Sequence, residues 1–87
     1  MEVDRILREG ERRQVTGVPT STWYDLIDQG LAPPGIKIGK YSVGWPATEL
    51  AALNAARIAG KGDDEIRGLV KRLIAARAKA FDRFAAA

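Results

Sequence analysis

The sequence contains neither cysteine nor histidine. Their absence excludes disulfide bonds, thiolate nucleophiles, zinc sites built from these residue types, imidazole general bases and most serine triads. No apolar run approaches the ~20 residues that a membrane span needs, and the first four residues lack the basic start of a signal peptide. With 87 residues, the chain is also short for a protein with a deep active-site cleft. We therefore expect a cytoplasmic protein that is not an enzyme, does not enter the membrane and uses no metal or cofactor.

Positive charge is in slight excess, with 14 basic and 11 acidic residues and a net charge of +3. The excess lies entirely in residues 46–87, where eight basic residues face five acidic ones, whereas residues 1–45 carry six of each. A basic protein favours a polyanionic partner. Because the N-terminal half is neutral, charge alone gives only weak support for nucleic-acid binding.

Large apolar side chains are few, since alanine supplies much of the 46% hydrophobic fraction and buries little area per residue. The predicted core residues are Ile6, Leu7, Val15, Trp23, Leu26, Ile27, Ile36, Ile38, Val43, Trp45, Leu50 and Leu53. Both tryptophans are expected to be buried because their spacing turns them inward and their rings carry the most area.

The N-terminal half predicts a short strand, two helices and a β-hairpin. A strand is expected over residues 5–8, and a short polar helix over residues 10–16 that stops at Gly17. A second helix of about ten residues follows Thr20-Ser21-Thr22, whose hydroxyls suit helix N-terminal capping. Residues 36–38 and 42–45 then alternate as the two strands of a hairpin. Its inward side chains are expected to be Ile36, Ile38, Val43 and Trp45, and its projecting ones Lys37, Lys40 and Tyr41.

The C-terminal half predicts two helices, one over residues 47–59 and one that begins at Asp63-Asp64-Glu65. These acids favour a helix N-terminus through the helix dipole, which is a better interpretation than a metal cluster. The last helix is strongly amphipathic, and its apolar face comprises Ile66, Leu69, Val70, Leu73, Ile74, Phe81 and Phe84. Two ways of burying this face compete, namely folding back on the core and pairing with another chain. We favour self-association, because Gly60-Lys61-Gly62 is expected to act as a hinge that frees the helix.

The order of elements is typical of a winged helix-turn-helix, in which a short helix, a tight turn and an amphipathic helix precede a hairpin. The predicted fold class is mainly α with a small β-hairpin and an added C-terminal helix. We expect a DNA-binding domain over residues 1–60 and a helical extension over residues 61–87. A generic small α+β domain, whose hairpin merely closes the core, is the alternative that the pattern leaves open.

Three segments together resemble the AlpA family of phage-type regulators, which are related to MerR-like winged helices and to excisionases. They are the run from Val15 to Ile27, the run Ile36-Lys37-Ile38-Gly39, and Val43-Gly44-Trp45, with Gly30 and Pro34 between them. The match covers roughly residues 5–58. It implies DNA binding in transcriptional control or prophage excision, with the second helix in the major groove and the hairpin as wing.

The chain departs from the family pattern in its first two helices. Glu9 and Arg12 stand where family members tend to carry apolar residues. Pro19 takes a place usually held by a serine cap, and Thr20 a place that is often arginine. The resemblance therefore implies fewer phosphate contacts here than in a typical member.

The predicted DNA-binding residues lie on the second helix, the first helix and the wing. They are Thr20, Ser21, Tyr24, Arg12, Arg13, Lys37, Lys40 and Tyr41. The predicted partner is double-stranded DNA at the bacterial nucleoid, together with a second copy of the chain. The sequence does not say whether RNA polymerase or a recombinase is a partner. A protein-interaction adaptor, built on the winged scaffold and the last helix, is the alternative function.

Overall fold

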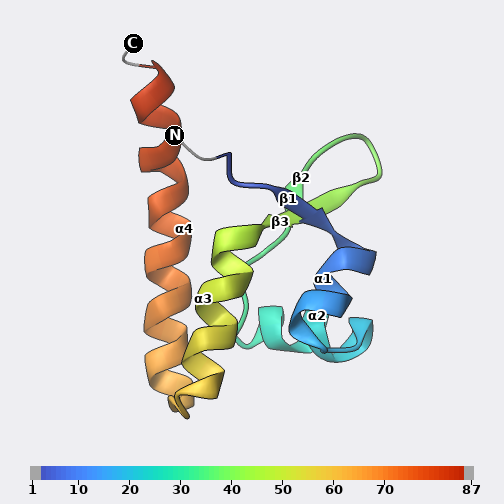
Figure 1. Cartoon of the computed structure of the whole chain (residues 1–87), viewed down its shortest axis with the longest axis vertical. Coiled ribbons are helices and arrows are strands. Elements are labelled where there is room, and N and C mark those ends of the chain that lie inside the picture. The colour runs from blue at the N-terminus through green and yellow to red at the C-terminus, as the bar shows by residue number, and fades with distance from the viewer. Residues whose placement is uncertain (1–2, 86–87) are drawn as a thin grey trace.

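The computed structural model describes residues 3–85 of the chain. Its elements (Figure 1) are, in chain order, β1 (Ile6–Arg8), α1 (Glu9–Thr16), α2 (Thr20–Asp28), β2 (Ile36–Lys37), β3 (Val43–Pro46), α3 (Ala47–Ile58) and α4 (Asp63–Ala85). The fold is mainly helical with a small antiparallel sheet, which confirms the predicted fold class and is consistent with a winged-helix-like arrangement. Within the described residues, no helix is both long enough and apolar enough to cross a membrane.

The sheet has three strands in the order β1-β3-β2, and both pairings are antiparallel. The predicted hairpin supplies β2 and β3, while β1 pairs with the other edge of β3 and places Leu7 opposite Trp45. A Cβ on Gly44 would lie 2.6 Å from Cγ2 of Ile6 and 2.7 Å from Cδ1 of Ile38. Any larger residue at this central position would therefore push the two isoleucines apart.

Four of the predicted core residues are largely exposed. Ile6, Val15, Ile38 and Val43 expose 47%, 44%, 47% and 37% of their surface. Ile6 and Ile38 meet over Gly44, and alternation along β3 puts that face of the sheet opposite the one that carries Trp45. Val15 stays outside because Arg12 is the buried side chain of α1.

The core gathers around two tryptophans, as predicted. Trp23 and Trp45 are 2% and 0% exposed, and their rings meet edge to face with centroids 5.6 Å apart. The indole of Trp45 donates a hydrogen bond to the Pro33 carbonyl at 2.9 Å, so its polar group is satisfied. The other buried apolar residues are Leu7, Leu31, Ala32, Leu50, Leu53, Ile66 and Val70.

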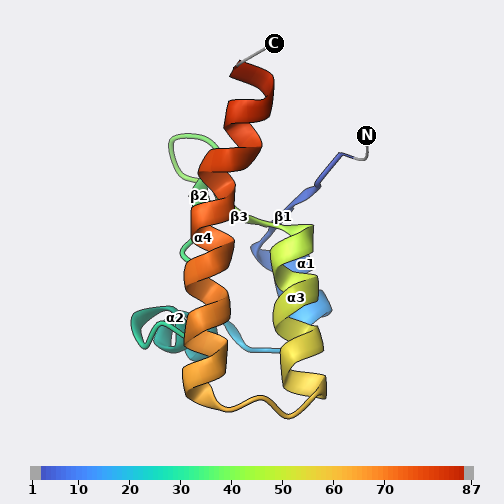
Figure 2. The same ribbon diagram turned by 90° about the vertical axis from the view of Figure 1, so that its left-hand side faces the viewer.

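The helix α4 lies beside α3 and runs antiparallel to it (Figures 1 and 2). Ile66 and Val70 of its first half are 2% and 4% exposed within the core of the same chain. The expected free hinge at residues 60–62 is therefore wrong, because α4 folds back on the chain. The far end of α4 projects beyond the start of α3 (Figure 1).

Candidate nucleic-acid interface

The outward face of α2 carries the side chains predicted to read DNA. Ser21 and Thr20 are exposed in the first turn, and Tyr24 is 43% exposed one turn further on, while Trp23 points into the core. The Tyr24 ring contacts Trp45 edge to face at a centroid distance of 6.4 Å. This contact holds one side of the phenol against the core and leaves the other side open.

The wing presents the predicted basic and aromatic side chains to solvent. Lys37 and Lys40 are exposed, and Tyr41 at the loop is 90% exposed. The Lys40 ammonium lies 5.4 Å from the centre of the Tyr41 ring, within the range of a cation–π contact. In both views α2 and the β2–β3 loop project from the same side of the molecule, at different heights along its long axis (Figures 1 and 2).

Two arginines of α1 have opposite environments. Arg13 is exposed and borders a shallow hollow on the surface beside the turn between α1 and α2. Arg12 is 0% exposed, so the expectation that it contacts a phosphate is wrong. Its guanidinium carbon lies 4.7 Å from the centre of the Trp23 ring, which it covers from the α1 side.

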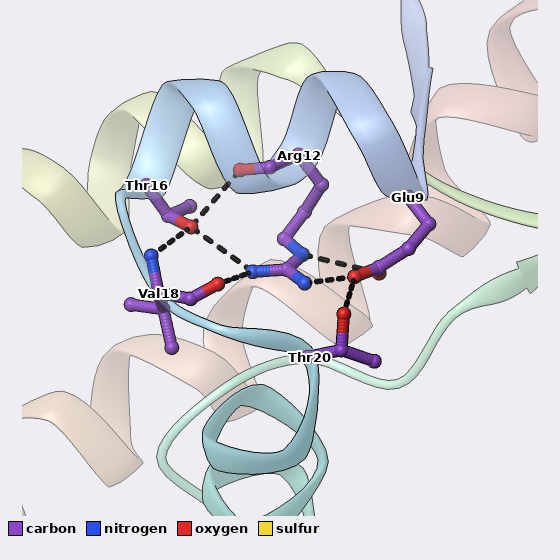
Figure 3. Close-up of polar contacts among 5 residues, drawn as sticks. All are labelled: Glu9, Arg12, Thr16, Val18 and Thr20. Atoms are coloured by element: carbon purple, nitrogen blue, oxygen red, sulfur yellow. Dashed lines mark hydrogen bonds and ion pairs between the residues drawn. The ribbon is translucent and has the colours of Figure 1, made fainter.

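The buried Arg12 joins α1 to the N-terminal end of α2 through a network of polar contacts (Figure 3). It forms an ion pair with Glu9 and donates hydrogen bonds to Oγ1 of Thr16, at 3.2 Å, and to the Val18 carbonyl. The hydroxyl of Thr20 donates to Oε2 of Glu9 at 2.7 Å, which closes the network from the α2 side. The turn is thus fixed by charge-assisted hydrogen bonds, which are stronger than neutral ones.

This network changes the ionisation of Glu9. Partial burial acts to raise the pKa of its carboxyl group, but the hydrogen bonds from Thr20 and Arg12 and the charges of Arg12 and Arg13 outweigh it. The pKa of Glu9 is therefore lowered from its ordinary value of 4.5. The carboxylate stays ionised at neutral pH, as the ion pair requires.

The predicted capping role of the Thr20-Ser21-Thr22 hydroxyls is wrong. The helix already begins at Thr20, its N-cap is Pro19, and within residues 3–85 no side chain caps it. Thr20 instead donates to Glu9. The first backbone N–H groups of α2 are left without a side-chain acceptor from the described part of the chain.

Sequence reasoning missed Arg8 as a contributor to the wing. Arg8 ends β1, is exposed, and donates a hydrogen bond to the Ser42 hydroxyl at 2.8 Å. It thereby adds a cation at the root of the β2–β3 loop. A signal was present in Arg8 as a basic residue at the end of the predicted strand over residues 5–8, but its value depends on β1 pairing with β3, which the sequence did not predict.

The predicted self-association residues fall into two groups along α4. Ile66 and Val70 belong to the core of the chain, and Leu69 packs against it, so these positions are not available to a partner. Leu73 is half-buried. The apolar residues of α4 that remain exposed are Ile74 at 40%, Phe81 at 70% and Phe84 at 64%.

A family model described as prophage CP4-57 regulatory protein (AlpA) matches residues 5–57. The chain belongs to the AlpA family. The resemblance inferred from the sequence is confirmed, and the family is one of phage regulatory proteins. The AlpA match runs from the residue before β1 almost to the end of α3, so it includes α1, α2 and the wing and leaves α4 outside.

A protein of Enterobacteria phage P4, described as uncharacterized protein ORF88, is 40% identical to the chain over 58 residues. The alignment covers 67% of this chain and 66% of the phage protein, which is just under two thirds of that protein's length. No solved structure matches the chain significantly. Membership of the AlpA family thus rests chiefly on the segment that contains α1, α2 and the hairpin.

Proposed function

We propose that this protein is a sequence-specific DNA-binding regulator, acting in transcription or as an excisionase-like recombination directionality factor. In this proposal α2 enters the major groove and the β2–β3 hairpin acts as wing. The observation that carries it is the division of α2 into a buried face centred on Trp23 and an exposed polar face that starts at Ser21 and Tyr24. A membership in a family of phage regulators supports the same conclusion. Such a regulator acts in the cytoplasm, at the nucleoid.

The N-terminal end of α2 is the part best suited to approach DNA. Its uncapped N–H groups and the positive end of the helix dipole favour a nearby phosphate. The exposed Asp25 and Asp28 lie further along the helix, where they would repel the phosphate backbone. Hence we expect the first turn of α2 to face the duplex most closely, with Ser21 and Tyr24 at base edges.

Phosphate contacts must come from neighbouring elements, because α2 itself carries no basic residue. Arg13 on α1 and Lys37 and Lys40 on the wing are exposed on either side of α2 in the chain. Contacts of this kind position a protein on the duplex and carry no sequence information. The proposal therefore assigns specificity to α2 and anchoring to α1 and the wing.

Selection of bound duplexes from a random DNA pool tests the proposal. Enrichment of one site, with an affinity that falls steeply as salt rises, is the expected result because phosphate neutralisation releases counterions. A palindrome or direct repeat in the site would also give the stoichiometry, since half-site spacing mirrors protein symmetry. If no sequence is enriched at low salt, the regulator proposal fails.

The second candidate, a protein-interaction role of α4, is favoured by the exposure of Phe81 and Phe84 near the C-terminal end of α4. We propose self-association through this end of α4, because its apolar stripe continues that of the buried first half. The area is small against the ~1,200 to 2,000 Å² that stable interfaces bury, so the dimer is expected to be weak. Light scattering that shows a monomer at ~100 μM, where contacts of even modest affinity are populated, would contradict it. A binding partner other than DNA or a second copy, held without salt dependence, would instead support an adaptor.

A further inference from the structure

The segment between α2 and β2 passes through the interior of the molecule. Leu31 and Ala32 are 5% and 1% exposed, and Pro33 is buried as well. The segment starts at Gly30, whose φ of 76° lets the chain leave α2, and the N–H of Leu31 bonds to the Leu26 carbonyl at 2.8 Å. Because this segment joins α2 to the wing, its path sets the angle between them.

Arg67 of α4 holds the start of this segment. Its Nε donates a hydrogen bond to the carbonyl of Gln29, the C-terminal cap of α2, at 2.9 Å. A Cβ on Gly30 would lie 3.8 Å from Cγ of Arg67, so the arginine stem packs directly beside the turn. Asp64, one turn earlier on α4, lies 3.4 Å from Nη1 of Arg67 and orients the guanidinium.

Arg77 of α4 holds the end of the same segment. Its Nη2 donates to the Pro34 carbonyl at 2.9 Å and to Oε1 of Glu49 at 2.6 Å, while its Nε donates to Oε2 of Glu49 at 2.8 Å. The side chains of Arg77 and Glu49 are 23% and 6% exposed, so this bidentate pair is largely shielded from solvent. The geometry leaves Arg77 little freedom to move away from Pro34.

These two arginines are ten residues apart on one continuous helix, which corresponds to a rise of ~15 Å. We infer that Arg67 and Arg77 are positioning residues for DNA recognition, and that α4 is a rigid support that fixes the orientation of α2 relative to the wing. This inference rests on the proposed function. Both arginines lie outside residues 5–57, which the family model matches, so the AlpA segment alone does not contain these two contacts from α4.

Neither arginine needs to touch DNA for this role. Both donate to backbone carbonyls after the last turn of α2, whereas the proposed reading residues Ser21 and Tyr24 lie in its first two turns. Releasing the segment would let α2 change its tilt while Trp23 keeps it in the core. Base contacts depend on that tilt, but loose phosphate contacts do not, so specific binding should suffer more than non-specific binding.

The test uses the full chain with two variants and one control. Arg67→Met removes the donor to Gln29 and keeps an apolar stem. Arg77→Met is combined with Glu49→Gln, so that no shielded carboxylate is left without its partner. Arg72→Met, at an exposed position on α4 with no ion pair among residues 3–85, matches the single charge lost in Arg67→Met. The Arg77→Met, Glu49→Gln combination leaves the net charge unchanged. Folding is checked by circular dichroism, and the affinities for the selected duplex and for an unrelated duplex are measured at several salt concentrations.

We expect each test variant to lower the ratio of specific to non-specific affinity about tenfold, because each loses one hydrogen bond that orients the reading helix through the segment. The control should stay within about twofold. Nuclear magnetic resonance of the free protein gives a readout independent of DNA. The indole N–H of Trp45, which donates to Pro33, and the backbone amides of residues 29–32 and 35 should shift in both test variants and not in Arg72→Met.

Three results would overturn the inference. One is a folded test variant that keeps the wild-type affinity ratio. Another is an equal loss for both duplexes, which would mean that the arginines act as charges. The third is that the resonances of the Trp45 indole N–H and of the amides of residues 29–32 and 35 stay unchanged. If the wild-type chain itself selects no duplex, the proposed function fails, and the resonance shifts alone decide whether α4 fixes the segment. Should the Arg77→Met combination not fold, Arg77→Lys, which cannot form the bidentate pair, is measured in the same way with a smaller expected loss.

Discussion

Both ends of α2 are held by arginine side chains that donate hydrogen bonds to backbone carbonyls. The two ends differ in how far each arginine lies from its partners along the sequence. At the N-terminal end, Arg12 binds Glu9, Thr16 and Val18, all within six residues of it. At the C-terminal end, Arg67 reaches Gln29, which is 38 residues away, and in the segment that follows Arg77 reaches Glu49 and Pro34, which are 28 and 43 residues away. The first junction is therefore local, whereas the second requires most of the chain to be folded.

This difference has consequences for stability and for function. Glu9 exposes 34% of its side chain, so water can replace Arg12 as its partner, but Glu49 exposes only 6% and has no such replacement. The local junction also lies inside the AlpA match, while α4 lies outside it. We conclude that the chain combines a turn inside the AlpA match with a second clamp that α4, outside the match, adds.

The largest effect is expected for Trp45, which lies between the two junctions. Its ring packs against Trp23, and its indole binds Pro33. Trp45→Ala should lower the free energy of unfolding by ~3 to 5 kcal/mol, comparable to the whole stability of a small domain. A melting temperature within one or two degrees of wild type, where ~4 to 8 °C per kcal/mol is usual, would show that the sheet is not part of the core.

The next effect separates the two junctions directly. Arg77→Met leaves the shielded Glu49 carboxylate unpaired and should cost about 3 kcal/mol in urea unfolding. Arg12→Met should cost less, about 1 to 2 kcal/mol, because Glu9 can be hydrated and the methionine can still cover Trp23. Adding Glu49→Gln to Arg77→Met should recover part of its loss. A larger cost at Arg12 than at Arg77 would reverse the comparison.

Between the junctions, the outward face of α2 should matter for DNA binding and little for folding. Tyr24→Ala and Ser21→Ala should each lower the affinity for the selected site by ~1 to 3 kcal/mol, and Lys40→Ala should weaken all duplexes alike and reduce the salt slope by about one. Gel-shift titrations measure both effects, and circular dichroism confirms that the variants stay folded. Wild-type binding by a folded Tyr24→Ala, Ser21→Ala double variant would exclude α2 as the reading helix.

The smallest effect is the pH dependence of the local junction. Because the pKa of Glu9 is lowered in the folded state, its ionised form stabilises the fold above about pH 4.5, and this contribution disappears as the pH falls through the lowered pKa. Wild type should therefore exceed Glu9→Gln in stability at pH 7, by about 1 kcal/mol or less because the pair is partly screened. The gap should close on acidification. Glu11→Gln, at an exposed ion pair of the same helix, is the matched control and should show a smaller gap at pH 7.

Local patterns in the sequence predicted most of the elements. Gly17 ends α1, the acidic turn at residues 63–65 begins α4, and both tryptophans are buried, because each of these features depends on neighbouring residues or on sheer apolar area. The family was also identifiable from short segments between residues 15 and 45. The exposed site residues on α2 and the wing could be predicted because the large apolar side chains of these elements must be buried, which leaves the polar ones on the surface.

Only the tertiary structure decided which polar residues are buried and what α4 packs against. As a basic residue, Arg12 is of a type suited to phosphate contacts. Its burial is favourable because Glu9, Thr16 and Val18 all accept hydrogen bonds from its side chain. The amphipathic face of α4 is compatible with a partner chain or with its own core, and the choice falls on the core because Glu49 and the carbonyls of Gln29 and Pro34 accept its arginines. The periodicity of α4 indicates that its apolar face must be buried. The surface that buries this face is formed by residues distant in the sequence, so no local pattern predicts which surface it is.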